Sequence, residues 1–206
     1  MKKIHFASLF LFTAILISSC VSSLYPISEH ENDFIFREEL IGHWVNKDMN
    51  TQVTLEKSDL HKYRITVIDK KSCELGGKKI SAFDTSYFSG FLIQLEGQYF
   101  FDCTADTDHP QFKCLGEETR SSLLPLHFIY KIRFIGNNQL SIAGINKDAM
   151  QQFIDKDRNN IKHEQPDKDH VLLTADAAGL QRKILTNKQA MVFTESDTLT
   201  RKKSYP

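Results

Sequence analysis

Hydrophobic side chains at every second position limit most strongly how this chain can fold. Within residues 126–135, five apolar side chains lie on one side of an extended strand, namely Leu126, Phe128, Tyr130, Ile132 and Phe134. Residues 53–56 and 63–68 show the same period of two. We therefore predict a mainly β fold, with an antiparallel sheet that curls into a barrel-like or sandwich form.

Two turns are expected to join neighbouring strands into hairpins. Glu96-Gly97 separates the apolar run 88–95 from the run 99–103, and glycine supplies the positive φ that a tight hairpin turn needs. Residues 136–138 should act in the same way before a strand at 140–145.

In the C-terminal half the hydrophobic period changes to 3.6, which predicts two helices. The first lies near 147–160 and follows Asn146, a residue type that favours the N-cap position. A charged loop is expected at 162–169, and Thr174 is the predicted N-cap of the second helix. A last, weaker strand is predicted around 197–201.

The first twenty residues have the order of a bacterial export signal. Lys2 and Lys3 precede an apolar run that is too short for a membrane-spanning helix, and small residues follow it. Ile17-Ser18-Ser19-Cys20 resembles the lipobox of bacterial lipoproteins. This resemblance implies that Cys20 becomes the first mature residue and carries a diacylglyceryl group and an N-acyl chain such as palmitate. The alternatives are an ordinary cleaved signal with a coincidental cysteine and an uncleaved anchor.

These features divide the chain into three parts. Residues 1–19 are the predicted signal peptide, residues 20–33 are the lipidated cysteine with a polar, proline-broken tether, and residues 34–203 are a single β-rich globular domain. Several acyl chains hold a protein stably at a membrane. If the sorting of Gram-negative lipoproteins applies, Val21 and Ser22 after the cysteine, in place of an aspartate, imply the outer membrane of the cell envelope.

The charge balance bears on the choice of partner. The chain has 26 Lys and Arg residues and 26 Asp and Glu residues, so its formal net charge is zero. Nucleic-acid binding requires a surplus of basic side chains to neutralise phosphates. Nucleic acid is therefore not an expected partner.

Besides Cys20, three cysteines remain in what should be an oxidising compartment. An odd number allows at most one intramolecular bridge. We expect it between Cys103 and Cys114, which enclose a short segment, with Cys73 as a buried free thiol. Pairing of Cys73 with either of the others is the alternative, because spacing along the sequence does not show which β-carbons face one another.

Gly42-His43-Trp44 follows a predicted helical turn at residues 37–40 and opens the first strand. The tripeptide resembles the Gly-x-Trp signature at the start of lipocalin-like barrels, in which the tryptophan plugs one barrel end. Trp44 is then either a core anchor or a ligand contact, and we expect a core anchor because it is the only tryptophan in the chain. Two helices in the C-terminal half depart from the lipocalin order, which usually has one.

A second resemblance rests on three short motifs: Phe100-Phe101-Asp102, Leu124-Pro125-Leu126-His127, and Leu172-Leu173-Thr174-Ala175 with Leu180-Gln181. With these motifs the chain is similar, over residues 34–203, to a group of bacterial β-rich lipoproteins that have no established activity. The resemblance implies no catalytic residue.

Two groups of residues have the chemistry of a site. Asp102, His109 and His127 offer acid and base groups, but no recognised catalytic motif surrounds them, and an enzyme is not the expected function. Cys103, His109 and Cys114 are zinc-ligand types, but five and four intervening residues match no closed Cys/His finger. No metal or cofactor is expected.

The sequence therefore predicts a membrane-anchored binding or assembly module that contacts an envelope protein or a small apolar ligand. The alternatives are an envelope hydrolase with an unrecognised site and a purely structural partner in a larger complex. A pocket lined by Asp102 and a histidine would favour the hydrolase. An apolar cavity beside Trp44 would favour ligand binding.

Overall fold

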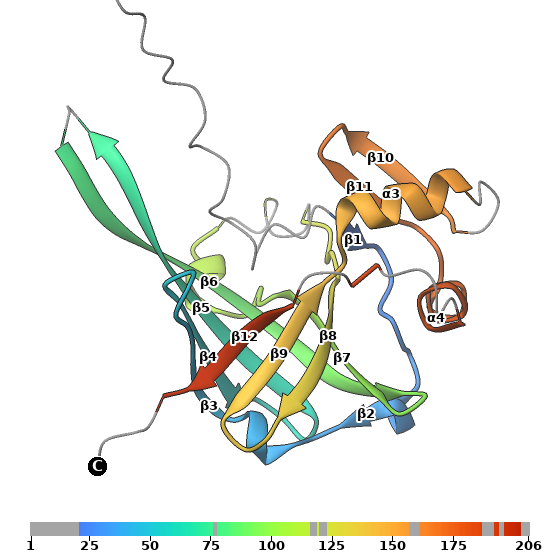
Figure 1. The fold of residues 1–206 in the computed structure, drawn as a ribbon, viewed down its shortest axis with the longest axis horizontal. Coiled ribbons are helices and arrows are strands. Elements are labelled where there is room, and N and C mark those ends of the chain that lie inside the picture. The colour runs from blue at the N-terminus through green and yellow to red at the C-terminus, as the bar shows by residue number, and fades with distance from the viewer. Residues whose placement is uncertain are drawn as a thin grey trace, which may run out of the picture.

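Within the described residues, eight antiparallel strands close into a barrel in this computed structural model (Figure 1). The structure describes residues 21–75, 78–115, 119, 123–156, 161–186, 192–193 and 196–202. The predicted signal and Cys20 lie outside this part of the chain. The barrel strands are β3 (Gly42–Asn46), β4 (Thr51–Lys57), β5 (Lys62–Leu75), β6 (Lys78–Leu95), β7 (Gln98–Ala105), β8 (Phe128–Ile135), β9 (Gln139–Gly144) and β12 (Asp197–Arg201).

The strand order confirms the predicted mainly β, barrel-like fold. Each strand from β3 to β9 pairs with the next one along the chain, and β12 closes the ring by pairing with both β9 and β3. The predicted hairpin turn at Glu96 and Gly97 is confirmed, with φ values of 48° and 75°. The short strand β2 (Phe34–Ile35) pairs with β6 outside the ring.

Alternation along β7 creates two faces of the barrel wall. Phe101 and Cys103 belong to the core inside the barrel, whereas Phe100 belongs to a second core outside it. Gly90 on β6 lies opposite Cys103, and a Cβ there would lie 2.5 Å from the Asp102 carbonyl oxygen. Glycine is therefore required where these two strands approach closely.

Between β9 and β12 the chain forms two helices and a hairpin: α3 (Lys147–Lys156), β10 (His163–Asp167), β11 (His170–Leu173) and α4 (Ala177–Thr186). Asn146 caps α3 as predicted, since its side chain accepts the Ala149 N–H at 2.9 Å. Two expectations were wrong. Residues 163–167 of the predicted charged loop pair with β11, and the side chain of Asp176, not Thr174, accepts an N–H of α4.

The predicted tether at residues 21–33 is wrong for the described residues. β1 (Val21–Ser23) pairs in parallel with β11, Ser23 forms a backbone bridge to His127, and Val21 and Ile27 are buried. Only a few apolar side chains anchor this segment, and they follow no period, so the sequence pattern did not reveal it. The remaining short helices are η1 (Glu31–Asp33), η2 (Glu38–Leu40) and α1 (Pro110–Lys113).

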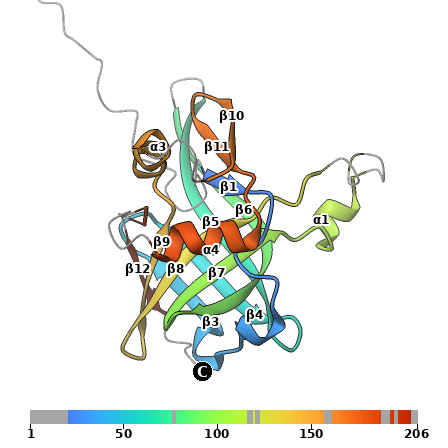
Figure 2. The ribbon, with the colours of Figure 1, turned by 90° about the vertical axis from the view of Figure 1, so that its right-hand side faces the viewer.

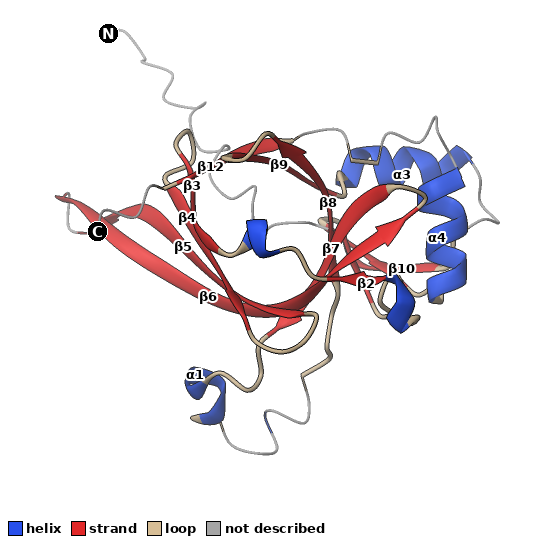
Figure 3. Ribbon diagram, turned by 90° about the horizontal axis from the view of Figure 1, so that it is seen from below, coloured by secondary structure: helices blue, strands red, loops and turns tan. Residues whose placement is uncertain are grey.

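A second hydrophobic core lies between the outer face of the barrel and these added elements. In Figure 2 α4 crosses the outer face of the barrel in front of β7 and β8, and Figure 3 shows α3 and α4 on a different side of the barrel from α1. We call this the outer core. Its members include Val21, Ile27, Ile93, Phe100, Ile129, Met150, Ile154, Val171, Leu173 and Leu180.

Candidate functional site

Trp44 on β3 belongs to the core inside the barrel and is bonded to η2, the short helix that precedes this strand. The side chain is 1% exposed, and its indole N–H donates to the Leu40 carbonyl oxygen at 2.8 Å. Arg201 from β12 lies over the ring, with Cζ 4.4 Å from the ring centroid. Trp44 thus fastens η2 to β3, and Leu40, not Trp44, lines the cavity inside the barrel.

Arg201 ties the last strand to the first part of the barrel. Its guanidinium donates to the carbonyl oxygens of Ile41 and Glu39, which flank the end of η2. Gly42 has φ of 139°, and a Cβ there would lie 2.8 Å from Arg201 Nη1. Sequence analysis assigned no role to Arg201, because nothing in the chain links residues so far apart.

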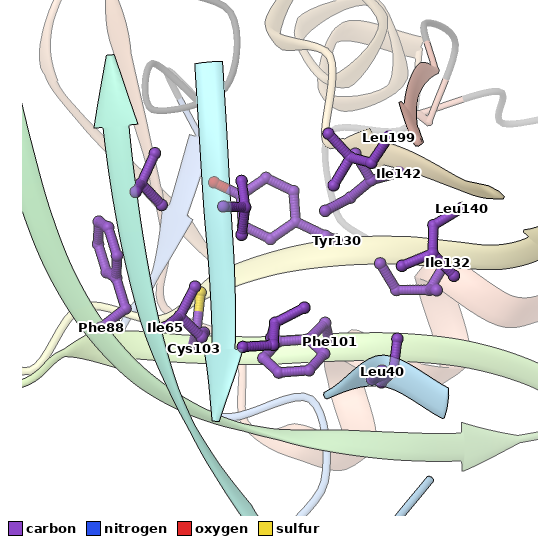
Figure 4. A pocket seen from close by; sticks show the side chains of 13 residues that line it. Leu40, Ile65, Phe88, Phe101, Cys103, Tyr130, Ile132, Leu140, Ile142 and Leu199 are labelled. Carbon is purple, nitrogen blue, oxygen red and sulfur yellow. The ribbon is translucent and has the colours of Figure 1, made fainter. Parts of the chain in front are cut away.

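The barrel encloses an apolar cavity of about 80 Å³ (Figure 4). Two of its lining side chains carry a heteroatom, the Cys103 thiol and the Tyr130 phenol. Burial raises the pKa of both groups, so both remain neutral at physiological pH. The lining residues are Leu40, Val53, Leu55, Ile65, Val67, Phe88, Phe101, Cys103, Tyr130, Ile132, Leu140, Ile142 and Leu199.

The predicted bridge between Cys103 and Cys114 is not formed, and both cysteines are free. Alternation along β7 places Cys103 inside the barrel, where its thiol lies 3.6 Å from the Phe128 carbonyl oxygen. Cys114 is exposed after α1, outside the barrel. The wall of the barrel therefore separates the two sulfur atoms. The side chain of Cys73 lies outside the described residues.

A second pocket, of about 250 Å³, lies on the outer wall of the barrel beneath the N-terminal segment. At its floor Asp102 is 4% exposed, and its Oδ1 lies 2.7 Å from His127 Nδ1. The other oxygen, Oδ2, accepts the Ile27 N–H at 2.7 Å. The lining residues are Pro26, Ser28, Glu29, Phe34, Lys62, Ser89, Gly90, Phe91, Ile93, Asp102, Thr104 and His127.

The structure thus brings together two of the three predicted acid and base residues. His109 instead stacks on Tyr87, with ring centroids 3.5 Å apart, and accepts the Gln111 N–H at the start of α1. A carboxylate-oriented imidazole is half of a hydrolytic centre. Within the described part of the chain no serine or threonine hydroxyl is hydrogen-bonded to His127.

The outer pocket also contains residues that sequence analysis missed. Lys62 and Ser89 lie on outward-facing positions of β5 and β6, next to inward-facing Tyr63 and Phe88. The alternation could have placed them on the outer face. Their approach to His127, however, depends on the barrel curvature and on the register of the intervening strands.

Among the described residues, no three His, Cys, Asp or Glu side chains gather as a metal site. None of the described helices has the length and apolar character needed to cross a membrane. No family model matches the chain, and comparisons with curated proteins and with solved structures gave no match.

Proposed function

We propose that this protein is a lipid-anchored binding module of the bacterial cell envelope whose barrel accepts a small apolar ligand. The observation that carries the proposal is the inner cavity, which is apolar except for two neutral groups and has Leu40 of η2, the residue bonded to Trp44, in its lining. Such a wall attracts hydrocarbon and excludes charged groups, because burying an unpaired charge is costly.

The cavity volume limits the ligand. An engineered apolar cavity of about 150 Å³ accommodates benzene, and this cavity is about 80 Å³. It therefore holds only a few carbon atoms without rearrangement. We infer that the end of an aliphatic chain is the best fit, at roughly 0.8 kcal/mol for each methylene group removed from water.

Trp44 provides the readout for a binding experiment, because it is the only tryptophan and it contacts Leu40 at the base of the cavity. Dodecanoate carrying bromine on its terminal carbon should quench Trp44 fluorescence saturably. The isomer brominated beside the carboxylate should quench it less, because the carboxylate stays outside the apolar wall.

A matched pair of variants tests whether the ligand enters the barrel. Val67→Phe fills the cavity and should abolish quenching, whereas Val45→Phe adds the same ring at a half-buried β3 position outside the cavity lining and should leave quenching unchanged. Equal quenching in both variants, or none in the wild-type protein, would contradict the proposal.

The anchor is tested separately by labelling cells with radioactive palmitate. Cys20→Ala should abolish incorporation of the label, whereas Cys114→Ala, which removes an exposed thiol, should not. Unchanged labelling of Cys20→Ala would contradict the anchor while leaving the cavity proposal intact. Fractionation of labelled cells then tests the expected outer-membrane location.

A further inference from the structure

The outer pocket is built around a charged group that is almost completely buried. Both oxygens of Asp102 are occupied, one by the Ile27 N–H and the other by His127 Nδ1. The carboxylate therefore fixes the orientation of the imidazole ring against the pocket. Asp102 acts as a positioning residue, and His127 is the group that faces a ligand.

Asp102 also determines which ring nitrogen of His127 carries the proton. An ionised carboxylate only accepts hydrogen bonds, so Nδ1 donates, and in a neutral imidazole Nε2 then keeps its lone pair. Within the described residues, Nε2 has no hydrogen-bond partner. In its neutral form His127 thus offers the pocket a hydrogen-bond acceptor.

Neighbouring strands supply donors to the same pocket. The ammonium group of Lys62 on β5 and the hydroxyls of Ser89 on β6 and Thr104 on β7 line it. None of these three side-chain groups has a hydrogen bond or ion pair with another described residue. An ammonium group only donates, whereas a hydroxyl donates or accepts.

This combination discriminates between classes of ligand. A simple carboxylate can accept from Lys62 but cannot donate to His127 Nε2, and an ammonium group can donate to His127 but cannot accept from Lys62. Exposed Glu29 also lines the pocket and offsets the charge of Lys62. A ligand with neighbouring hydroxyl groups satisfies both residues, and we propose that this pocket binds a saccharide unit.

The size and the apolar wall of the pocket agree with one sugar ring. At roughly 30 Å³ for each water molecule, the 250 Å³ volume corresponds to about eight water-sized groups. Phe34 and Phe91, stacked with ring centroids 4.7 Å apart, form an apolar wall together with Ile93. The C–H face of a sugar ring would lie against this wall while its hydroxyls face His127 and Lys62.

Nuclear magnetic resonance of the nitrogen-labelled full chain tests the proposal. Glucose, galactose, mannose and N-acetylglucosamine are titrated to about 100 mM, which covers millimolar Kd values, while the Ile27 and Gly90 amides and the His127 ring nitrogens are observed. At least one sugar should give saturable shifts at these positions. Glycerol and sodium acetate, as polyol and anion controls, should not.

Matched variants locate the binding groups. Lys62→Met and Thr104→Val should weaken sugar binding by roughly fivefold or more, as expected for removal of one hydrogen bond. Lys131→Met and Thr66→Val remove the same groups from half-buried positions outside the pocket and should bind like the wild-type protein. Unchanged binding in Lys62→Met would assign the sugar to another site and overturn the proposal.

Asp102→Asn tests the proton position at His127. Its amide can donate to Nδ1 while its oxygen still accepts the Ile27 N–H, which moves the imidazole proton to Nε2. In a folded protein, the shift typical of a protonated ring nitrogen should then move from Nδ1 to Nε2 of His127, and sugar binding should weaken, because the hydroxyl that donated to Nε2 must rotate to accept from it. The proposal is wrong if no sugar gives saturable shifts, or if acetate binds in their place. Hydrolysis of p-nitrophenyl acetate that depends on His127 would also contradict saccharide binding and would indicate a hydrolase instead.

Discussion

The two hydrophobic cores of this molecule share the barrel wall, but the inner core surrounds the apolar cavity and the outer core does not line it. Both cores contain side chains with no exposed surface, such as Met150 in the outer core and Leu92 in the inner core, whereas the cavity-lining Val53 and Val67 each keep 9%. The inner residues retain that surface because they face the cavity. Helices and the N-terminal segment can adjust to fill the outer core, but a closed ring of strands has a fixed width.

This difference separates stability from binding. The outer core fastens the N-terminal segment and the elements between β9 and β12 to the barrel. None of its described residues lines the inner cavity. The inner core encloses the proposed apolar ligand site. Changes in the outer core should therefore affect folding and leave binding in the inner cavity unchanged, whereas changes in the inner core should affect both properties.

The largest expected effect comes from Trp44→Ala. We expect a loss of about 3–5 kcal/mol in the free energy of unfolding, typical of truncating a large buried aromatic side chain, because Leu40 loses its indole partner and Arg201 its ring contact. Chemical denaturation measures the loss. A loss below about 1 kcal/mol would show that η2 packs on the barrel without Trp44.

Leu180→Ala is the matched change in the outer core. It should cost about 2–5 kcal/mol, the range for buried leucine, since Leu180 is completely buried. Unlike Trp44→Ala, it should leave the affinity for a nonbrominated aliphatic probe unchanged in isothermal titration calorimetry. Equal losses of affinity in the two variants would contradict the inference that the outer core affects stability without affecting binding in the inner cavity.

Asp102→Ala tests how the N-terminal segment is fastened to the barrel. The change leaves the Ile27 N–H and His127 Nδ1 without their acceptor, at about 1–3 kcal/mol for each unsatisfied group. Hydrogen exchange of the Ile27 amide should accelerate, while the Val53 and Val67 amides inside the barrel should exchange at rates set by global unfolding. Asp102→Asn, which keeps one acceptor, should cost less. Unchanged exchange at Ile27 would show that Val21 and Ile27 hold the segment through apolar packing alone.

The sequence predicted the barrel better than the outer core for a physical reason. Strand alternation is local, so Phe128, Tyr130 and Ile132 reveal their shared face without any knowledge of their partners. The outer core is formed by residues distant in the chain, such as Val21 with Val171, and no period relates them. The same limit applies to the sites: Asp102 and His127 were recognisable as residue types, but their contact depends on the pairing of β7 with β8.

Substitution of the cysteines should have the smallest effect on the free energy of unfolding. It also allows a direct comparison of the two sides of the barrel wall. Cys114→Ser should change the free energy of unfolding by less than about 0.5 kcal/mol, as for most surface substitutions. Cys103→Ser should cost about 1–3 kcal/mol because it places a hydroxyl in the apolar cavity.

In the native wild-type protein iodoacetamide should modify exposed Cys114 first, since burial raises the pKa of Cys103 and thereby reduces its thiolate fraction. An aliphatic ligand should slow modification of Cys103 further and leave Cys114 unaffected. Peptide mapping after timed labelling measures both rates, and a Cys103–Cys114 disulfide found under nonreducing conditions would show that the two residues are not separated by the barrel wall.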